Sequence, residues 1–316
     1  MASSTFVERT DEYAQHSTSG LSLTDLLLLC MALIWGLNFI VVKFATGVFA
    51  PLAFNGARVS LAVIVLWGIF LARRQPLPRR RDIMIMLALG ALGNGLYQIL
   101  WVEGMARTRA SDAALLVAAS PAFIALLGWL RGEERAGFRG MSGIVLSLVG
   151  IGLVVTGAAR SAAGKSTLAG NAFILGSVLC WSVYSVYLRP VTIRIDGLTL
   201  SAVTMTGGSI PLLIAAAPSL TTTNWGAVPP AGWAAIAYSG LLALVVAYLF
   251  WYRGVRAFGP TRTSMYSNLQ PLVAMLAAWP LLGEIPRAMQ LMGAACIIGG
   301  LLLTRIGASS REAAHS

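Results

Sequence analysis

Polar and aromatic residues recur at helical spacing inside the long apolar stretches of this chain. Asn94, Tyr97, Gln98 and Trp101 follow the pattern i, i+3, i+4, i+7, which places them on one face of a helix. Their amide and phenol groups can hydrogen-bond a solute, and their rings can stack on one. A catalytic centre would need paired acids, a metal cluster or an activated nucleophile, and this face has none of these. The pattern therefore predicts a binding surface.

Three other apolar stretches carry a similar face. A polar atom that faces lipid costs several kcal/mol unless it finds a partner or water, so we expect the four faces to meet around one cavity. The alternative is that each group hydrogen-bonds a neighbouring helix. The three faces consist of Met31, Trp35 and Asn38; of Ser177, Trp181, Tyr184 and Ser185; and of Ser264, Ser267, Asn268 and Pro271. The predicted substrate-binding residues are Trp35, Asn38, Asn94, Tyr97, Gln98, Trp101, Trp181, Tyr184, Ser267 and Asn268.

Two prolines and two basic residues are further candidates. Pro121 and Pro271 each remove a backbone donor from an expected helix, which produces either a fixed kink or a hinge that gates the cavity. Lys43 and Arg58 lie within apolar stretches, where either side chain could contact a substrate carboxylate. For Lys43 the alternative is that the side chain extends to the membrane surface and only anchors its helix.

Acidic side chains are missing from the middle of the apolar stretches. Glu103, Asp112, Glu134 and Glu284 all lie near the ends of these stretches. A proton-coupled pump usually has a carboxylate or a histidine inside the membrane, so the pattern favours gradient-driven movement over obligatory proton coupling. We predict no cofactor and no metal site, because the three cysteines lack metal-ligand spacing.

The elements that must position these residues are membrane-spanning helices. The chain is 57% hydrophobic and 11% charged, whereas a soluble domain has about 25% charged residues. A span needs ~20 residues to cross ~30 Å of hydrocarbon. The charge clusters divide the chain into ten such stretches, which predicts an all-α integral membrane protein. The expected spans are 25–45, 51–72, 82–105, 109–130, 139–157, 169–189, 197–217, 232–254, 260–282 and 287–304.

The basic residues predict the orientation of these spans. Arg73, Arg74 and the run Arg79–Arg81 share one side of the membrane with most other arginines when the loops alternate, so both termini are expected in the cytoplasm. The net charge of +11 then reflects membrane orientation, and no nucleic-acid partner is expected. The expected partners are a small-molecule substrate and the lipid bilayer of the inner (plasma) membrane. The protein is expected to be a monomer or a weak homodimer.

The chain also repeats itself with an offset of about 150 positions. Pro121 matches Pro271, and Trp101 matches Trp251. Each half holds five expected spans, an odd number, so the second half must enter the membrane from the opposite side. This predicts an inverted repeat, an architecture that places a substrate site near the membrane midplane between its halves.

Several motifs resemble the EamA domains of the drug/metabolite transporter superfamily. The first copy is carried by "ALIWGLNFIVVKFA" from Ala32, "FNGARVSLA" from Phe54 and "GIVLSLVGIGLVV" from Gly143. The second is carried by "NLQPLVAMLAAWPLLGE" from Asn268 and "GAACIIGGLLL" from Gly293. The resemblance implies a ten-helix transporter that exports small metabolites, commonly amino acids, by alternating access. Within this family the aromatic content is similar to that of the YddG-type aromatic amino acid exporters.

The resemblance also implies a division of the chain. The two five-helix repeats cover 25–157 and 169–305, a polar connector covers 158–168, and cytoplasmic tails cover 1–24 and 306–316. Two alternatives to an amino acid exporter stay open. One is an exporter or facilitator of another metabolite class, such as a drug-like amphiphile, a purine or a sugar-like solute. The other is an intramembrane enzyme.

Overall fold

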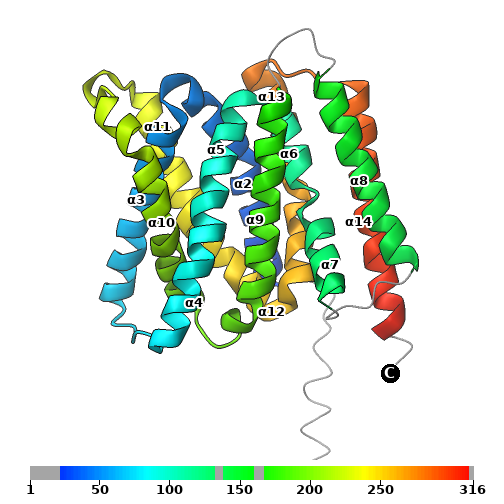
Figure 1. Cartoon of the computed structure of the whole chain (residues 1–316), viewed down its shortest axis with the longest axis horizontal. Helices are drawn as coiled ribbons and strands as arrows, with labels where there is room; N and C mark the ends of the chain where they lie inside the picture. The colour runs from blue at the N-terminus through cyan, green and yellow to red at the C-terminus, as the bar shows by residue number, and fades with distance from the viewer. Residues whose placement is uncertain (1–21, 132–137, 160–166, 313–316) are drawn as a thin grey trace, which may run out of the picture.

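The computed structural model describes residues 22–131, 138–159 and 167–312, and every regular element in these ranges is a helix. Figure 1 shows them as a bundle in which most helices run between the same two ends of the molecule. The first half comprises α2 (Leu23–Val48), α3 (Pro51–Ala72), α4 (Arg80–Gly90), η1 (Ala91–Leu96), α5 (Tyr97–Arg107), α6 (Ala110–Val117), α7 (Ser120–Leu130) and α8 (Phe138–Ala159). The second comprises α9 (Leu168–Thr192), α10 (Gly197–Thr222), η2 (Trp225–Ala227), α11 (Pro230–Ala237), η3 (Tyr238–Val246), α12 (Ala247–Ser267), α13 (Leu269–Leu282) and α14 (Ala288–Glu312).

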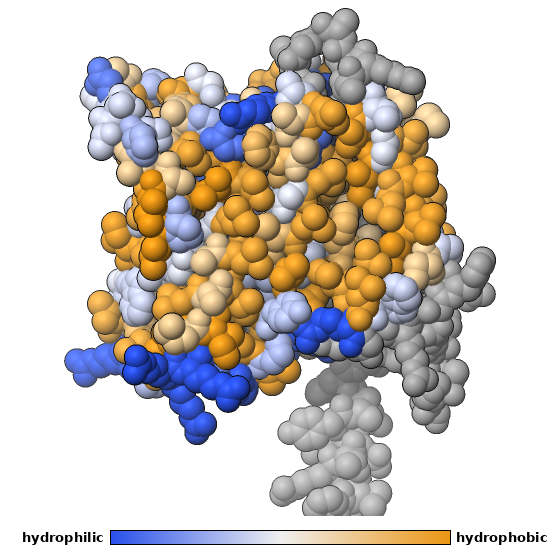
Figure 2. Space-filling model, in the orientation of Figure 1, coloured by the Kyte–Doolittle hydropathy of each residue, from blue (hydrophilic) through white to orange (hydrophobic). Residues whose placement is uncertain are grey.

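The composition of these helices makes the chain a multi-pass membrane protein. Seven stretches are long and apolar enough to cross a membrane: Leu23–Val48, Pro51–Ala72, Arg80–Arg107, Ala110–Leu130, Leu168–Thr192, Gly197–Thr222 and Pro230–Phe258. Three shorter apolar helices are Met141–Thr156, Leu269–Leu282 and Ala288–Gly300. Figure 2 shows apolar side chains across the middle of one face and hydrophilic ones toward both ends. The all-helical membrane fold is confirmed.

The structure differs from the expected spans at two junctions. The boundary expected at 255–259 falls inside α12, which continues to Ser267. The tail expected from residue 306 begins inside α14, which continues to Glu312. Most of the N-terminal tail, residues 160–166 of the connector and the last four residues lie outside the described part of the chain.

Four breaks in regular α-helix surround the middle of the bundle. The third and eighth expected spans each contain a π-helix, η1 and η3, and such segments occur often at functional sites because they change the direction of neighbouring side chains. The fourth span breaks between α6 and α7, and the next break falls at Asn268 between α12 and α13. Pro121 and Pro271 follow these two breaks within the first turn of α7 and α13, where a missing N–H costs least. Both predicted kinks are therefore real interruptions.

α8 and α14 lie side by side at one edge of the bundle (Figure 1). Their glycines allow close contact between the two backbones. A Cβ on Gly150 would lie 2.7 Å from the carbonyl oxygen of Gly293, and a Cβ on Gly300 would lie 2.4 Å from that of Gly143. This pair stands away from the contacts that form the centre, where α3 packs on α10, α5 on α9, and α2 on α12 and α13.

Candidate functional site

A cavity lies between the helices, and three of the four helix breaks border it: η3, the break between α6 and α7, and the break at Asn268. The space between its lining atoms, counted out to the open mouth, is about 850 Å³. It is bordered by α2, α3, α5, α9, η3, α12 and α13, and by both sides of the break between α6 and α7. The lining includes most of the residues predicted from the sequence: Trp35, Asn38, Arg58, Tyr97, Gln98, Trp101, Pro121, Trp181, Ser267, Asn268 and Pro271. The four predicted faces therefore meet around one space.

Two predicted substrate contacts lie behind the cavity wall. Tyr184 is fully buried and its hydroxyl contacts those of Tyr252 and Thr204. Its ring packs on Gly93 of η1, where a Cβ would lie 2.2 Å from a ring carbon, so the side chain points between helices. Asn94 is also fully buried. It belongs to η1, where the π-helical turn rotates it off the face expected for a regular α-helix. Neither residue lines the cavity.

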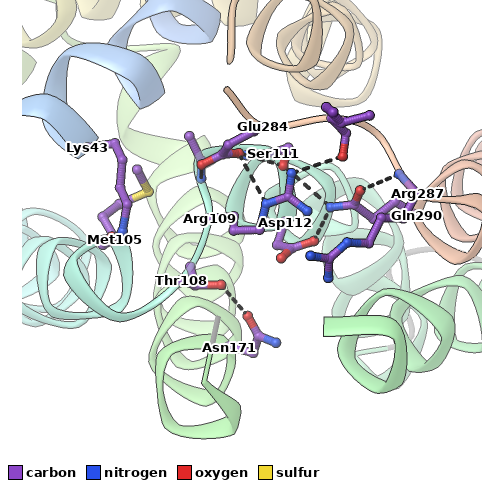
Figure 3. A network of polar contacts seen from close by, with 12 residues as sticks. Lys43, Met105, Thr108, Arg109, Ser111, Asp112, Asn171, Glu284, Arg287 and Gln290 are labelled. Atoms are coloured by element: carbon purple, nitrogen blue, oxygen red, sulfur yellow. Dashed lines mark hydrogen bonds and ion pairs between the residues drawn. The ribbon is translucent and has the colours of Figure 1, made fainter. Parts of the chain in front are cut away.

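Lys43 is also not a cavity residue. Its Nζ donates to the carbonyl oxygen of Met105 at 2.9 Å and to that of Ala106 at 3.4 Å, near the end of α5 (Figure 3). Carbonyls in the last turn of a helix lack partners within the helix, and a cation there is favourable. Lys43 therefore joins α2 to α5, and it is not among the residues that line the cavity.

Aromatic rings form much of the cavity wall. The Trp35 ring centroid lies 6.2 Å from that of Trp181 and 5.8 Å from that of Trp251, and the last two are 5.7 Å apart. Tyr248 lies 5.7 Å from Trp35, and Tyr97 lies 5.5 Å from Trp181. Edge-to-face and tilted pairs at these distances stabilise one another and still present ring faces to a guest.

Arg58 supplies a positive charge at the same cavity. It is 1% exposed, and its Cζ lies 5.0 Å from the ring centroid of Trp101. Its Nε donates to Asn55 Oδ1 at 2.7 Å, and its two terminal nitrogens donate to Ser239 Oγ and Gln98 Oε1, both at 2.6 Å. Among the ion pairs given for the described residues, none involves Arg58. Its guanidinium is held in place by neutral oxygens.

The hydrogen bonds of Arg58 continue into neighbouring helices. Ser239 Oγ donates to Asn38 Oδ1 at 2.7 Å, and Asn55 Nδ2 donates to the Gln98 carbonyl oxygen at 2.8 Å. The network thereby links α2, α3, α5 and η3. A buried arginine in such a network is fixed in direction, which is what recognition of an anion requires.

The sequence reasoning missed Tyr248, Trp251 and Ser239. Tyr248 and Trp251 line the cavity, and the repeat offset could have identified them, since they match Gln98 and Trp101 in the first half. Ser239 lies in η3, and its position beside Arg58 follows from tertiary packing. No signal in the sequence indicates that contact.

A second polar network joins the start of α6 to the segment between α13 and α14 (Figure 3). Glu284, 6% exposed, accepts from the backbone nitrogens of Ala110 and Ser111 at 3.0 Å each and from Ser111 Oγ at 2.7 Å. Arg109 Nε lies 3.7 Å from the same carboxylate. A carboxylate that caps the first turn of α6 in this way complements the unpaired N–H groups and the helix dipole there. The network ties α6 to the segment between α13 and α14.

The family comparison agrees with the resemblance drawn from the sequence motifs. The model of the EamA-like transporter family matches residues 22–156 and again residues 168–306. One solved crystal structure has the same fold, with a TM-score of 0.65 at 18% identity, covering 90% of this chain and 99% of the other.

Named relatives include transporters with different substrates. An uncharacterized transporter, YyaM, of Bacillus subtilis (strain 168) is 25% identical over 88% of this chain and 92% of its own. A probable terminal-alkyne amino-acid exporter of Streptantibioticus cattleyicolor is 28% identical over 77% of this chain and 79% of its own. An S-adenosylmethionine/S-adenosylhomocysteine transporter of Chlamydia trachomatis is 28% identical over 80% of each chain. With both halves matched by the family model, this chain belongs to the EamA-like transporter family.

Proposed function

We propose that this protein exports small carboxylate-bearing metabolites, aromatic amino acids among them, through the central cavity. The observation that carries the proposal is the position of Arg58. Its buried guanidinium borders a cavity lined by Trp35, Trp181 and Trp251, so a carboxylate and an aromatic side chain could be bound together. Arg recognises a carboxylate through two parallel hydrogen bonds, and an indole face stacks on a ring.

The relatives support a transporter of this kind without choosing its substrate. The probable terminal-alkyne amino-acid exporter favours amino acids, whereas the S-adenosylmethionine/S-adenosylhomocysteine transporter favours another metabolite class. The buried Arg58 at the cavity favours solutes with a carboxylate. An intramembrane enzyme is the weaker alternative, because the named relatives are transporters and the described cavity-lining residues include no pair of acids.

The mechanism we propose is alternating access between two inverted five-helix repeats, at residues 25–157 and 169–305. The breaks before Pro121 and Pro271, which both border the cavity, would act as hinges, since little backbone hydrogen bonding has to be broken there. Such a transporter would lie in the inner membrane with both termini in the cytoplasm. Among the described residues no acidic side chain lines the cavity, which supports facilitated export over obligatory proton coupling.

Efflux from proteoliposomes that contain only this protein tests the proposal. Phenylalanine and tryptophan should leave faster than alanine and leucine, with or without a pH gradient. Arg58→Gln should slow the efflux at least tenfold, because hydrogen bonds to charged groups contribute ~1.5–3 kcal/mol each. The efflux rate of Arg58→Lys, which keeps the charge, should lie between the rates of the unchanged protein and of Arg58→Gln. Arg107→Gln is the matched control, since that arginine is exposed, lies outside the cavity lining, pairs with Glu103 of its own helix and packs over the Phe173 ring.

Two results would contradict the proposal. Equal rates for the aromatic and the aliphatic amino acids would remove the role of the ring-lined wall. Normal efflux by a well-folded Arg58→Gln protein would remove the role of the guanidinium.

A further inference from the structure

The charge of the central cavity is unbalanced. Arg58 is positive, and none of the described residues that line the cavity is acidic. Three helices of the cavity wall do carry carboxylates, but these are hydrogen-bonded or paired elsewhere. Glu103 of α5 pairs with Arg107 of the same helix. Asp25 of α2 accepts from the backbone nitrogen of Ser22, and Asp112 of α6 accepts from Gln290. The lining residues therefore give the cavity a net positive charge, which an anionic guest would neutralise.

Arg58 itself and the neighbouring Trp101 both have hydrogen-bond donors left for a guest. Arg58 has more N–H groups than its three bonds to neutral oxygens use. Trp101, 4% exposed, lines the cavity beneath the guanidinium, and its Nε1–H has no hydrogen-bond partner among the described residues. A buried donor left without a partner costs free energy, so a site with two such donors is suited to an anionic oxygen pair.

A second residue that lines the cavity, at another helix break, has a buried acceptor without a partner in the described part of the chain. Asn268 lies between α12 and α13, and its buried Oδ1 has no hydrogen-bond partner among the described residues. This oxygen can accept from a hydroxyl or an acylated amine. Being neutral, it cannot balance the full charge of an ammonium group in a buried, low-dielectric site.

We propose that the cavity prefers aromatic monoanions over zwitterionic amino acids. The preferred guest has a carboxylate for Arg58 and Trp101, a ring for the aromatic wall, and a neutral hydrogen-bond donor, such as a hydroxyl or an N-acyl group, for Asn268. This inference rests on the proposed transport function and specifies the substrate class. A zwitterion has no net charge, so the occupied cavity keeps the single positive charge of Arg58 and holds the ammonium group in addition. A monoanion brings the net charge of the occupied cavity to zero.

The test compares three compounds of nearly equal shape with the full-length protein in lipid nanodiscs. L-3-phenyllactate differs from L-phenylalanine only by a hydroxyl in place of the ammonium, and L-phenylalanine amide lacks the carboxylate. Binding can be followed by the fluorescence of the cavity tryptophans and checked by calorimetry. Phenyllactate should bind at least tenfold more tightly than phenylalanine, and the amide should not bind.

Two variants extend this test. Arg58→Gln should abolish the preference for phenyllactate, and Arg58→Lys should retain it. Asn268→Asp places a carboxylate in the cavity, so it should reverse the order and favour phenylalanine. The control for Asn268→Asp is Asn224→Asp. It makes the same change at an exposed loop residue and should leave the order of affinities unchanged.

The outcomes separate this inference from the proposed function. If phenylalanine binds as tightly as phenyllactate and leaves proteoliposomes in the efflux assay, the preference for monoanions is wrong and the transport function stands. If neither compound binds or moves, both proposals are wrong. If Asn268→Asp leaves the order unchanged in a well-folded protein, the role of Asn268 as the neutral acceptor is wrong.

Discussion

Arg58 is unusual because it stays charged and buried without a carboxylate partner among the described residues. A charge in a membrane span is costly unless it is paired or faces water, and such residues generally mark a functional site. Here Asn55, Gln98 and Ser239 hold the guanidinium by three short hydrogen bonds. Their dipoles offset part of the desolvation cost but leave the net charge in place. A substrate carboxylate would complete the compensation.

Trp101 allows the hydrogen-bond donor to be separated from the aromatic ring. Trp101→Phe keeps a ring beneath Arg58 and removes the unpartnered Nε1–H. We expect about tenfold weaker binding of aromatic carboxylates, since a hydrogen bond to a charged group contributes ~1.5–3 kcal/mol. Calorimetric titration of the nanodisc protein measures the change. Trp129→Phe is the control, because Trp129 is 40% exposed and lies away from the cavity lining. An unchanged affinity in Trp101→Phe would contradict this role.

Tyr184 is expected to matter for stability and not for recognition. Its hydroxyl contacts Thr204 and Tyr252 on neighbouring helices. Tyr184→Phe should lower the free energy of unfolding by ~1–3 kcal/mol, because it leaves buried hydroxyls short of a partner. The affinity for substrate should not change. Thermal unfolding and calorimetric titration of the same preparation test both statements, and a selective loss of affinity would return Tyr184 to the binding site.

At the scale of elements, regular helical spacing explains which parts of the site could be predicted from the sequence. Trp35, Gln98 and Trp101 lie in α-helical turns, and the cavity contains all three as expected. Asn94 lies in a π-helix, where α-helical spacing assigns the wrong direction. Nothing in the residues Ala91–Leu96 signals that change, because it depends on how closely η1 packs against α9 and α10.

The close contact between α8 and α14 leads to a prediction about stability. Gly150→Leu should force these helices apart, because even a Cβ there would lie 2.7 Å from the carbonyl oxygen of Gly293. We expect a loss of ~1–3 kcal/mol in the free energy of unfolding, typical of overpacking. Gly152→Leu is a matched control on the same helix, where a Cβ meets nothing within 4 Å. Thermal unfolding in detergent measures both, and equal losses would contradict the packing role of Gly150.

At the scale of the whole molecule, the hydropathy pattern was enough to predict an all-helical membrane protein. The junction between the eighth and ninth expected spans was not predicted correctly, because α12 continues through it. Charge clusters such as Arg253 and Arg256 indicate where a chain leaves the hydrocarbon, but they do not end a helix. Helix ends depend on capping and packing, which the hydropathy of a stretch does not report.

In the proposed transport cycle, the network around Glu284 would close the cavity toward the outer side of the membrane. Glu284 holds the start of α6 through Ala110 and Ser111, one turn before α6 reaches the cavity wall at Ala114. Under the alternating access proposed above, we expect this contact to break when the cavity opens in that direction. Glu284→Gln keeps the shape of the side chain but replaces one accepting oxygen by a donor, so it should weaken the contact and favour the outward-open state.

Labelling of a cysteine in the cavity measures that shift. In a protein whose native Cys30, Cys180 and Cys296 are replaced by alanine, Ser267→Cys places a thiol in the cavity lining. A membrane-impermeant maleimide added from outside should react several-fold faster when Glu284→Gln is also present. Glu103→Gln is the control, since it removes the exposed pair with Arg107 near the same end of the bundle. A contact that limits opening must change the access of the maleimide to the cavity when the contact is weakened. If Glu284→Gln leaves the labelling rate unchanged in a protein that still transports, this network therefore does not govern opening.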